Sequence, residues 1–149
     1  MSEIDEIVDA FEFLEDWDAR YEYLIAIGED LPAMSEALKT NENWVKPCMS
    51  TVHVAAQQVP EDPALIRFIG DCDTAIIKGV LALLIDLLSY RSLEEIRSID
   101  VDSLFKRLHL EEHLSPNRHV GIYAIVEKML ERASVLPSYQ QVLLSTKQL

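Results

Sequence analysis

The chain has 149 residues, of which 49% are apolar, and carries a formal net charge of −13. This length fits one domain, and about two-thirds of the unfolded chain's surface can be buried on folding without a disulfide or metal ion. Residues 1–30 contain eleven acidic side chains and one basic side chain. Because so acidic a chain repels phosphate groups, nucleic acids and anionic membrane surfaces are not expected as partners. The acidic segment either provides solubility or docks a basic protein.

The sequence predicts neither a targeting segment nor a membrane span. Residues 1–10 contain four acids and lack the basic and long apolar stretches of a signal peptide. The most apolar stretch, residues 75–88, contains Lys78 and Asp86 and is too short to cross a bilayer. We therefore expect a cytoplasmic protein, in which the two cysteines stay reduced and do not form a structural disulfide.

Two helices are expected at the start of the chain. Apolar side chains fall on one stripe of a helix over residues 4–15. Asp16 or Asp18 can cap a second helix, which Gly28 ends. Residues 32–47 are predicted to be mostly irregular, because a polar run and a proline interrupt any regular pattern.

The middle of the chain predicts an antiparallel hairpin followed by a central helix. Alternating side chains over residues 50–57 and 65–70 are typical of strands, and residues 60–63 supply the turn between them. Asp71 or Asp73 is expected to cap the next helix. That helix is apolar on most sides, which predicts a place at the centre of the fold.

Three more helices are predicted in the last third of the chain, each beginning at a residue suited to capping it. Their expected N-terminal residues are Ser92 with its capping-box partner Glu95, Asp100 or Asp102, and Ser115 followed by Pro116. The last helix is predicted to run to about Ser134. Helices, then strands, then helices indicate an α+β fold. The domain is expected to span residues 1–136, and residues 137–149 are expected to form a loosely held tail.

Cys48 is the main candidate for chemistry, because it lies between an expected loop and an expected strand. Lys46, two residues away, favours the thiolate. No histidine has the spacing of the dedicated base that a hydrolytic cysteine enzyme needs. Persulfide exchange needs no such base, since the outer sulfur is already electrophilic and the leaving thiolate is a good one. The residues alone leave a buried structural cysteine as the alternative.

Three other features are weaker candidates. Cys72 lies between two aspartates, which raise the pKa of a thiol, so a structural role is expected for it. His109 and His113 stand in an H-x-x-E-H pattern that can share a zinc ion, but no third ligand is evident. Arg118 lies in the first turn of the last helix, where a cation opposes the helix dipole. This conflict suggests a partner for Arg118, either an internal carboxylate or another protein.

Four blocks of sequence in this order form a specific pattern. They are residues 17–25 (WDARYEYLI) with Gly28 and Leu31-Pro32, residues 45–52 (VKPCMSTV), residues 70–79 (GDCDTAIIKG), and residues 113–118 (HLSPNR) with Gly121. The pattern, which spans about residues 7–135, resembles the SufE family, including the CsdE proteins. This resemblance implies an IscU-like fold, with a small antiparallel sheet of about three strands packed against helices.

The resemblance also implies a function. A member of this family takes persulfide sulfur from a SufS-type cysteine desulfurase, stimulates that enzyme, and delivers the sulfur to a Suf-type scaffold for iron–sulfur cluster assembly. It is a sulfurtransferase-type carrier that acts as a desulfurase partner and not as a stand-alone enzyme, without a cofactor or metal ion of its own. An IscU-like cluster or metal scaffold is the alternative, although such scaffolds use three cysteines and this chain has two.

The resemblance implies that Cys48 holds the persulfide on a loop that shelters it and swings out to the desulfurase. The residues implied to hold this loop or the partner are Lys46, Pro47, Met49, Ser50, Asp71, Asp73 and Arg118. Three residues depart from the family pattern: Pro47 replaces a usual glycine, Met49 a frequent glutamine, and Cys72 a usual serine. Pro47 is expected to stiffen the loop. A disulfide between Cys72 and Cys48, if the two lay close together, would block sulfur transfer.

Overall fold

The sheet is an antiparallel hairpin. The computed structural model describes residues 3–47 and 50–137, and within them β1 (Val52–Val59) pairs with β2 (Asp62–Cys72). The predicted strands and turn are confirmed, and the α+β class with them. The expected count of about three strands is wrong, since the described sheet has two. Isolated bridges extend it, with Trp44 opposite His53 on one edge and Arg91 opposite Ile66 on the other.

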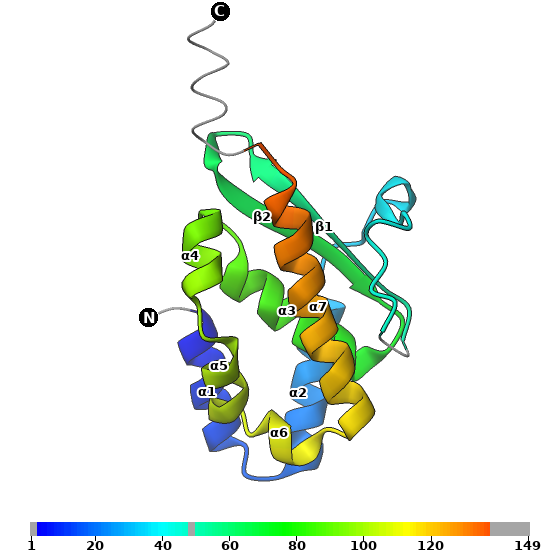
Figure 1. Cartoon of the computed structure of the whole chain (residues 1–149). Helices are drawn as coiled ribbons and strands as arrows, with labels where there is room; N and C mark the ends of the chain where they lie inside the picture. Colours follow the sequence, from blue (N-terminus) through cyan, green and yellow to red (C-terminus); the bar gives the residue numbers. More distant parts are fainter. Residues whose placement is uncertain (1–2, 48–49, 138–149) are drawn as a thin grey trace, which may run out of the picture.

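Figure 1 shows how the helices and the hairpin are arranged. The helices are α1 (Glu3–Phe13), α2 (Trp17–Glu29), the short 3-10 turn η1 (Glu36–Leu38), α3 (Ala75–Leu88), α4 (Leu93–Ser98), α5 (Val101–Arg107), α6 (Leu110–His113) and α7 (Pro116–Ser134). α3 packs against β2 and α2, and α7 packs against β1. None of the helices in the described part of the chain is long and apolar enough to cross a membrane.

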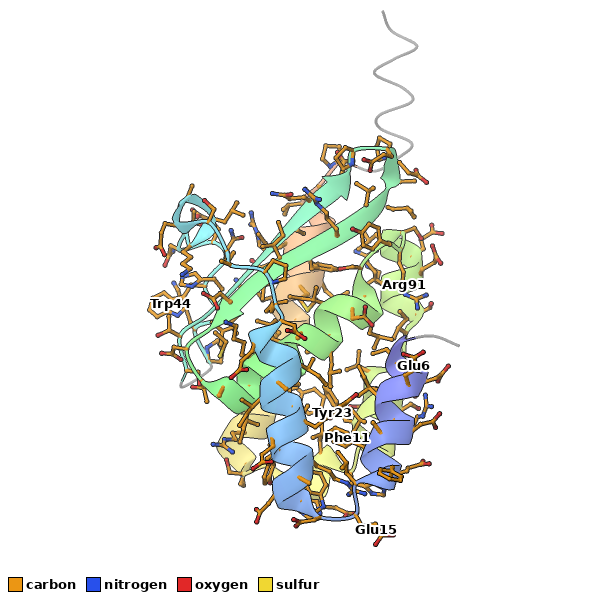
Figure 2. All side chains as sticks on the ribbon, turned by 180° about the vertical axis from the view of Figure 1, so that it is seen from behind. Glu6, Phe11, Glu15, Tyr23, Trp44 and Arg91 are labelled. Atoms are coloured by element: carbon orange, nitrogen blue, oxygen red, sulfur yellow. The ribbon has the colours of Figure 1, made fainter. Side chains whose placement is uncertain are left out.

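α3 lies at the centre of the core, as its sequence predicts. Leu81 and Leu83, which lie on nearly opposite sides of this helix, are each at most 1% exposed. α1 and α2 close one end of the core, where the ring of Phe11 packs edge-on against Tyr23 at 5.9 Å between centroids (Figure 2).

α2 and α3 approach each other closely, because glycines lie where they cross. A Cβ built on Gly79 would lie 2.2 Å from the carbonyl oxygen of Leu24, and one on Gly28 would lie 2.8 Å from the backbone nitrogen of Gly79. The absence of side chains at these positions therefore lets the two backbones touch.

Most of the predicted helix caps are confirmed. Asp16, Ser92, Asp100 and Ser115 each accept a hydrogen bond from a backbone N–H in the first turn of a helix, and Ser92 forms a capping box with Glu95.

The expected cap of α3 by Asp71 or Asp73 is wrong. The N-cap is Thr74, whose side chain makes no capping hydrogen bond. The carboxylate of Asp73 accepts the N–H of Thr51, and that of Asp71 pairs with two lysines. That use of their oxygens explains why the cap position falls to Thr74.

Candidate functional site

The segment that contains Cys48 is a loop closed by backbone hydrogen bonds. The N–H of Val45 donates to the carbonyl of Val52 at 2.9 Å, and the N–H of Val54 donates to the carbonyl of Asn43 at 2.8 Å. Cys48 and Met49 themselves lie outside the described residues. By sequence both belong to the segment between Val45 and Val52.

The C-terminal arm of the loop is anchored to the junction between β2 and α3. The hydroxyls of Ser50 and Thr74 share a hydrogen bond of 2.5 Å. The N–H of Thr51 donates to Oδ1 of Asp73 at 2.9 Å, and the N–H of Asp73 donates back to the carbonyl of Thr51 at 3.2 Å. The structure thus brings Ser50 and Asp73, two of the predicted site residues, into one cluster.

The N-terminal arm of the loop contrasts with this anchored arm. Lys46 and Pro47 are both exposed. The ammonium of Lys46 lies 5.8 Å from the centroid of the Trp44 ring, a cation–π contact worth about 0.5–1 kcal/mol at an exposed position. This contact is weak, so the described residues Lys46 and Pro47 are restrained less than Ser50 and Thr51, which form hydrogen bonds.

Asp71 joins three separate segments beside the loop. Its carboxylate lies 3.2 Å from Nζ of Lys39 and 3.4 Å from Nζ of Lys78, and it accepts the N–H of Cys72 at 2.9 Å. Burial by itself would raise the pKa of the Asp71 carboxyl. The Cys72 N–H and the two lysines outweigh burial, so the net effect lowers the pKa. Hydrogen bonds to Glu36 and to Asp71 raise the pKa of Lys39.

Lys39, Thr74 and Lys78 were missed as site residues from the sequence. Thr74 and Lys78 belong to the block of residues 70–79, so the resemblance contained a signal for them. Lys39 lies in a polar run far from Asp71 along the chain, and nothing in its spacing indicates their contact.

Cys72 is buried, as expected for a structural cysteine. Its side chain belongs to the hydrophobic core, with 7% of the residue exposed, and the N–H of Thr74 donates to its sulfur at 3.4 Å. The partner for the disulfide considered above, Cys48, lies outside the described residues.

Arg118 lies in the first turn of α7, where its N–H donates to the hydroxyl of Ser115. Its side chain is half-buried. Among the side chains that the structure describes, which do not include that of Glu111, no carboxylate forms an ion pair with its guanidinium. The sequence suggested either an internal carboxylate or another protein as the partner of Arg118. No described carboxylate pairs with it, so another protein stays the alternative.

The two histidines of the H-x-x-E-H pattern do not share one helical face. His109 precedes α6 in a left-handed conformation with φ of 56°. The ring of His113 stacks on Trp17, with 3.7 Å between centroids. Across the described part of the chain, no group of three His, Cys, Asp or Glu side chains could hold a metal ion. The described residues therefore contain no set of ligands for a zinc ion or another cofactor metal.

The chain is similar to known proteins in sequence and in fold. Residues 5–133 match the family model described as "SufE: Fe-S metabolism associated domain". An uncharacterized SufE-like protein of Rhizobium meliloti (strain 1021) is 36% identical over 135 residues, covering 89% of this chain and 96% of the relative. A second, from Rhizobium etli, is 36% identical over 137 residues, covering 91% and 92%. The solution structure of a hypothetical protein from Thermus thermophilus has the same fold, with a TM-score of 0.69 at 16% identity, covering 94% of this chain and 96% of that one.

Proposed function

Because the chain belongs to the SufE family of proteins associated with Fe–S metabolism, we propose that it accepts sulfur on Cys48 from a SufS-type cysteine desulfurase and delivers it to a Suf-type scaffold. The observation that carries this proposal is the loop closed between Val45 and Val52, to which Cys48 belongs by sequence and whose residues Ser50 and Thr51 are bound to the junction between β2 and α3. The protein would work in the cytoplasm as a partner of the desulfurase.

The proposed transfer is an exchange between sulfur atoms. The thiolate of Cys48 attacks the terminal sulfur of the persulfide on the desulfurase, and a new S–S bond forms there. The original S–S bond breaks, and its electron pair leaves with the cysteine thiolate of the desulfurase. Lys46 favours the thiolate form of Cys48. No general base is needed, which agrees with the lack of a histidine at a suitable spacing.

The described residues on the two sides of the loop differ in their contacts, and this difference supports the way in which Cys48 would reach the desulfurase. The arm that includes Thr51 is bound to Asp73, whereas Lys46 and Pro47 are exposed. A loop of this kind can pivot about its anchored arm while its tip reaches a partner. The fixed φ of Pro47 limits where the pivot can bend.

The proposal is tested by incubating the protein with a SufS-type desulfurase and cysteine and then recording its intact mass. Wild type and Cys72→Ser are expected to gain about 32 Da, the mass of one sulfur atom, whereas Cys48→Ser is expected to gain none. Peptide mapping should place the added sulfur on Cys48. Equal stimulation of the desulfurase by Cys48→Ser and wild type would overturn the mechanism. Iron–sulfur absorbance after anaerobic reconstitution would favour the scaffold alternative instead.

A further inference from the structure

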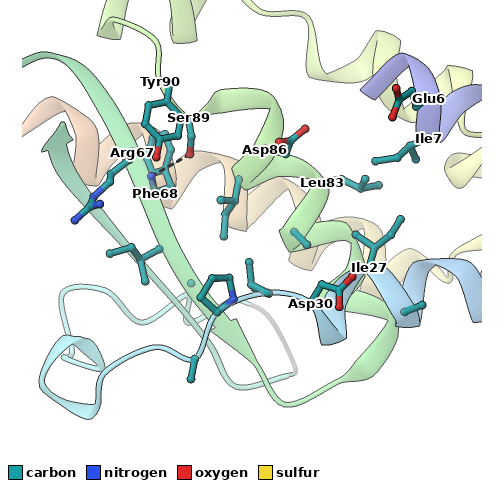
Figure 3. Close-up of a pocket in the computed structure, with 18 of the residues that line it drawn as sticks. Glu6, Ile7, Ile27, Asp30, Arg67, Phe68, Leu83, Asp86, Ser89 and Tyr90 are labelled. Carbon is teal, nitrogen blue, oxygen red and sulfur yellow. Dashed lines mark hydrogen bonds between the residues drawn. The ribbon is translucent and has the colours of Figure 1, made fainter. Parts of the chain in front are cut away.

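A cleft of about 790 Å³ lies beside the outer edge of β2 (Figure 3). Its walls come from α1, α2, the segment that follows α2, β2 and the C-terminal half of α3. The cleft is mostly lined by apolar side chains, among them Ile7, Ile27, Phe68 and Leu83. The residues that anchor the cysteine loop, Asp73 and Thr74, are not part of its lining. Its volume falls in the range of about 300–1,000 Å³ that is usual for ligand pockets.

The edge of β2 along this cleft carries backbone groups that the hairpin does not use. Ile66 donates its N–H to Arg91 and accepts the N–H of Tyr90, so its backbone groups point away from β1. Residues two apart on a strand present these groups to the same edge, which adds Phe68 and Gly70 to this set. The N–H of Phe68 donates to the hydroxyl of Ser89 at 3.1 Å (Figure 3).

The remaining groups on this edge have no partner in the described chain. Within residues 3–47 and 50–137, neither the carbonyl of Phe68 nor the N–H and carbonyl of Gly70 has a hydrogen bond on this side of the strand. Gly70 is nevertheless buried and lines the cleft. Backbone groups in such positions are normally paired, and an unpaired strand edge is a template for another strand.

The rim of the cleft is negatively charged. Glu6, Asp30 and Asp86 are exposed carboxylates from three different helices or helix ends. None of them forms an ion pair with a described residue. Arg67 also lines the cleft, but its guanidinium points away from it and donates to Gln57 at 3.0 Å (Figure 3). The charges that face an occupant are therefore mainly negative.

Tyr90 stands at the mouth of the cleft in a strained conformation. Its φ is 61°, which is uncommon for any residue except glycine, and the residue is 63% exposed. The hydrogen bond from its N–H to the carbonyl of Ile66, 2.6 Å long, holds it there. Strained backbone conformations are frequent at binding sites. An exposed tyrosine also offers a partner a large contact surface, and little side-chain entropy is lost when it is bound.

We propose that this cleft binds an extended segment of a partner protein, which adds a strand to the edge of β2 at Phe68 and Gly70. Main-chain hydrogen bonds to these residues would align the segment, its apolar side chains would enter the cleft, and its lysine or arginine side chains would meet Glu6, Asp30 and Asp86. The site would serve docking and is separate from the loop that contains Cys48. It does not depend on the proposed sulfur transfer.

The probe for this site is the synthetic peptide acetyl-Val-Lys-Val-Lys-Val-amide, added to the ¹⁵N-labelled full-length protein in an NMR titration. The chain has four glycines, so the amide resonance of Gly70 is readily assigned. We expect this resonance to shift downfield and its hydrogen exchange to slow as the N–H gains an acceptor. A peptide N-methylated at its central valine loses one backbone donor and should bind about tenfold more weakly.

Two protein variants test the charged rim. Asp30→Lys with Asp86→Lys should weaken binding at least fivefold, whereas Asp9→Lys with Glu127→Lys makes the same change in net charge at exposed positions outside the cleft and should not. A saturating titration that leaves Gly70 unmoved would refute the proposal, as would equal binding of the N-methylated peptide, which indicates attraction between charges alone. Tighter binding by a synthetic peptide of residues 138–149 would make this chain's own segment the occupant and overturn the proposal of a partner.

Discussion

Replacing Gly79 by alanine tests how closely α2 and α3 must pack to hold the fold together. The new Cβ would lie 2.2 Å from the carbonyl oxygen and 2.7 Å from the carbonyl carbon of Leu24. Both atoms belong to the backbone of α2, so no side-chain rotation can relieve the clash. The helices would have to separate by about 1 Å, which forfeits a quarter to a half of each affected van der Waals contact.

Two opposing effects determine how much this substitution changes the free energy of unfolding. Alanine favours a helix over glycine by about 1 kcal/mol, which on its own would stabilise the variant. Overpacking of a core costs about 1–3 kcal/mol, and a backbone obstacle places Gly79→Ala at the upper end of that range. We therefore expect a net loss of about 2 kcal/mol in the free energy of unfolding. The start of α3, which anchors the cysteine loop, would shift with the helix.

Urea denaturation followed by circular dichroism measures this loss, with an unchanged m-value as evidence that the folded state stays compact. Ala26→Gly is the matched control, because Ala26 is exposed in the middle of α2 and its replacement changes helix propensity without a clash. The control should lose about 1 kcal/mol. If Gly79→Ala proved as stable as wild type or more stable, α2 and α3 would have room between them and the argument would fail.

Two further predictions concern the carboxylates beside the loop. Asp73→Ala removes the acceptor for the N–H of Thr51, a hydrogen bond worth about 1 kcal/mol. The alkylation of Cys48, followed by mass spectrometry, should therefore become about fivefold faster, whereas the control Asp9→Ala should leave its rate unchanged. An unchanged rate in Asp73→Ala would show that this hydrogen bond does not restrain the loop. Asp71 has a lowered pKa in the folded protein, so its charge stabilises the fold at neutral pH, and this contribution is lost as the pH falls below about 4. Asp71→Asn should accordingly be less stable than wild type to urea at pH 7, and the difference should become smaller as the pH falls from 7 to 3. A difference of the same size at both pH values would contradict the assignment.

Features that depend on neighbouring residues were predictable from the sequence. The capping box of Ser92 and Glu95 is closed within one helical turn, and Ser115 with Pro116 marks the start of α7 for the same reason. The hairpin follows from two alternating segments separated by a turn of fixed length. The helix caps and the hairpin depend on contacts among neighbouring residues, so distant parts of the chain do not easily change them.

Features that depend on distant contacts were not predictable. Asp73 has the character of a helix cap, but its carboxylate binds Thr51, which reaches it only because β1 and β2 pair. His109 and His113 have the spacing of a helical metal pair, yet the left-handed conformation of His109 separates them. The spacing of side chains in a sequence predicts which of them a helix would place on one face. Tertiary contacts determine whether that helix forms.

The cation–π pair beside the loop has a practical consequence. Trp44 is one of two tryptophans in the chain, is 41% exposed, and lies against Lys46 within the segment that leads to Cys48. The other, Trp17, is stacked on His113 at the far end of α2. A chain with Trp17→Phe would therefore contain a single tryptophan, and it would lie next to the loop. Opening of the loop, or docking of another protein on it, would become visible as a change in emission without any attached label.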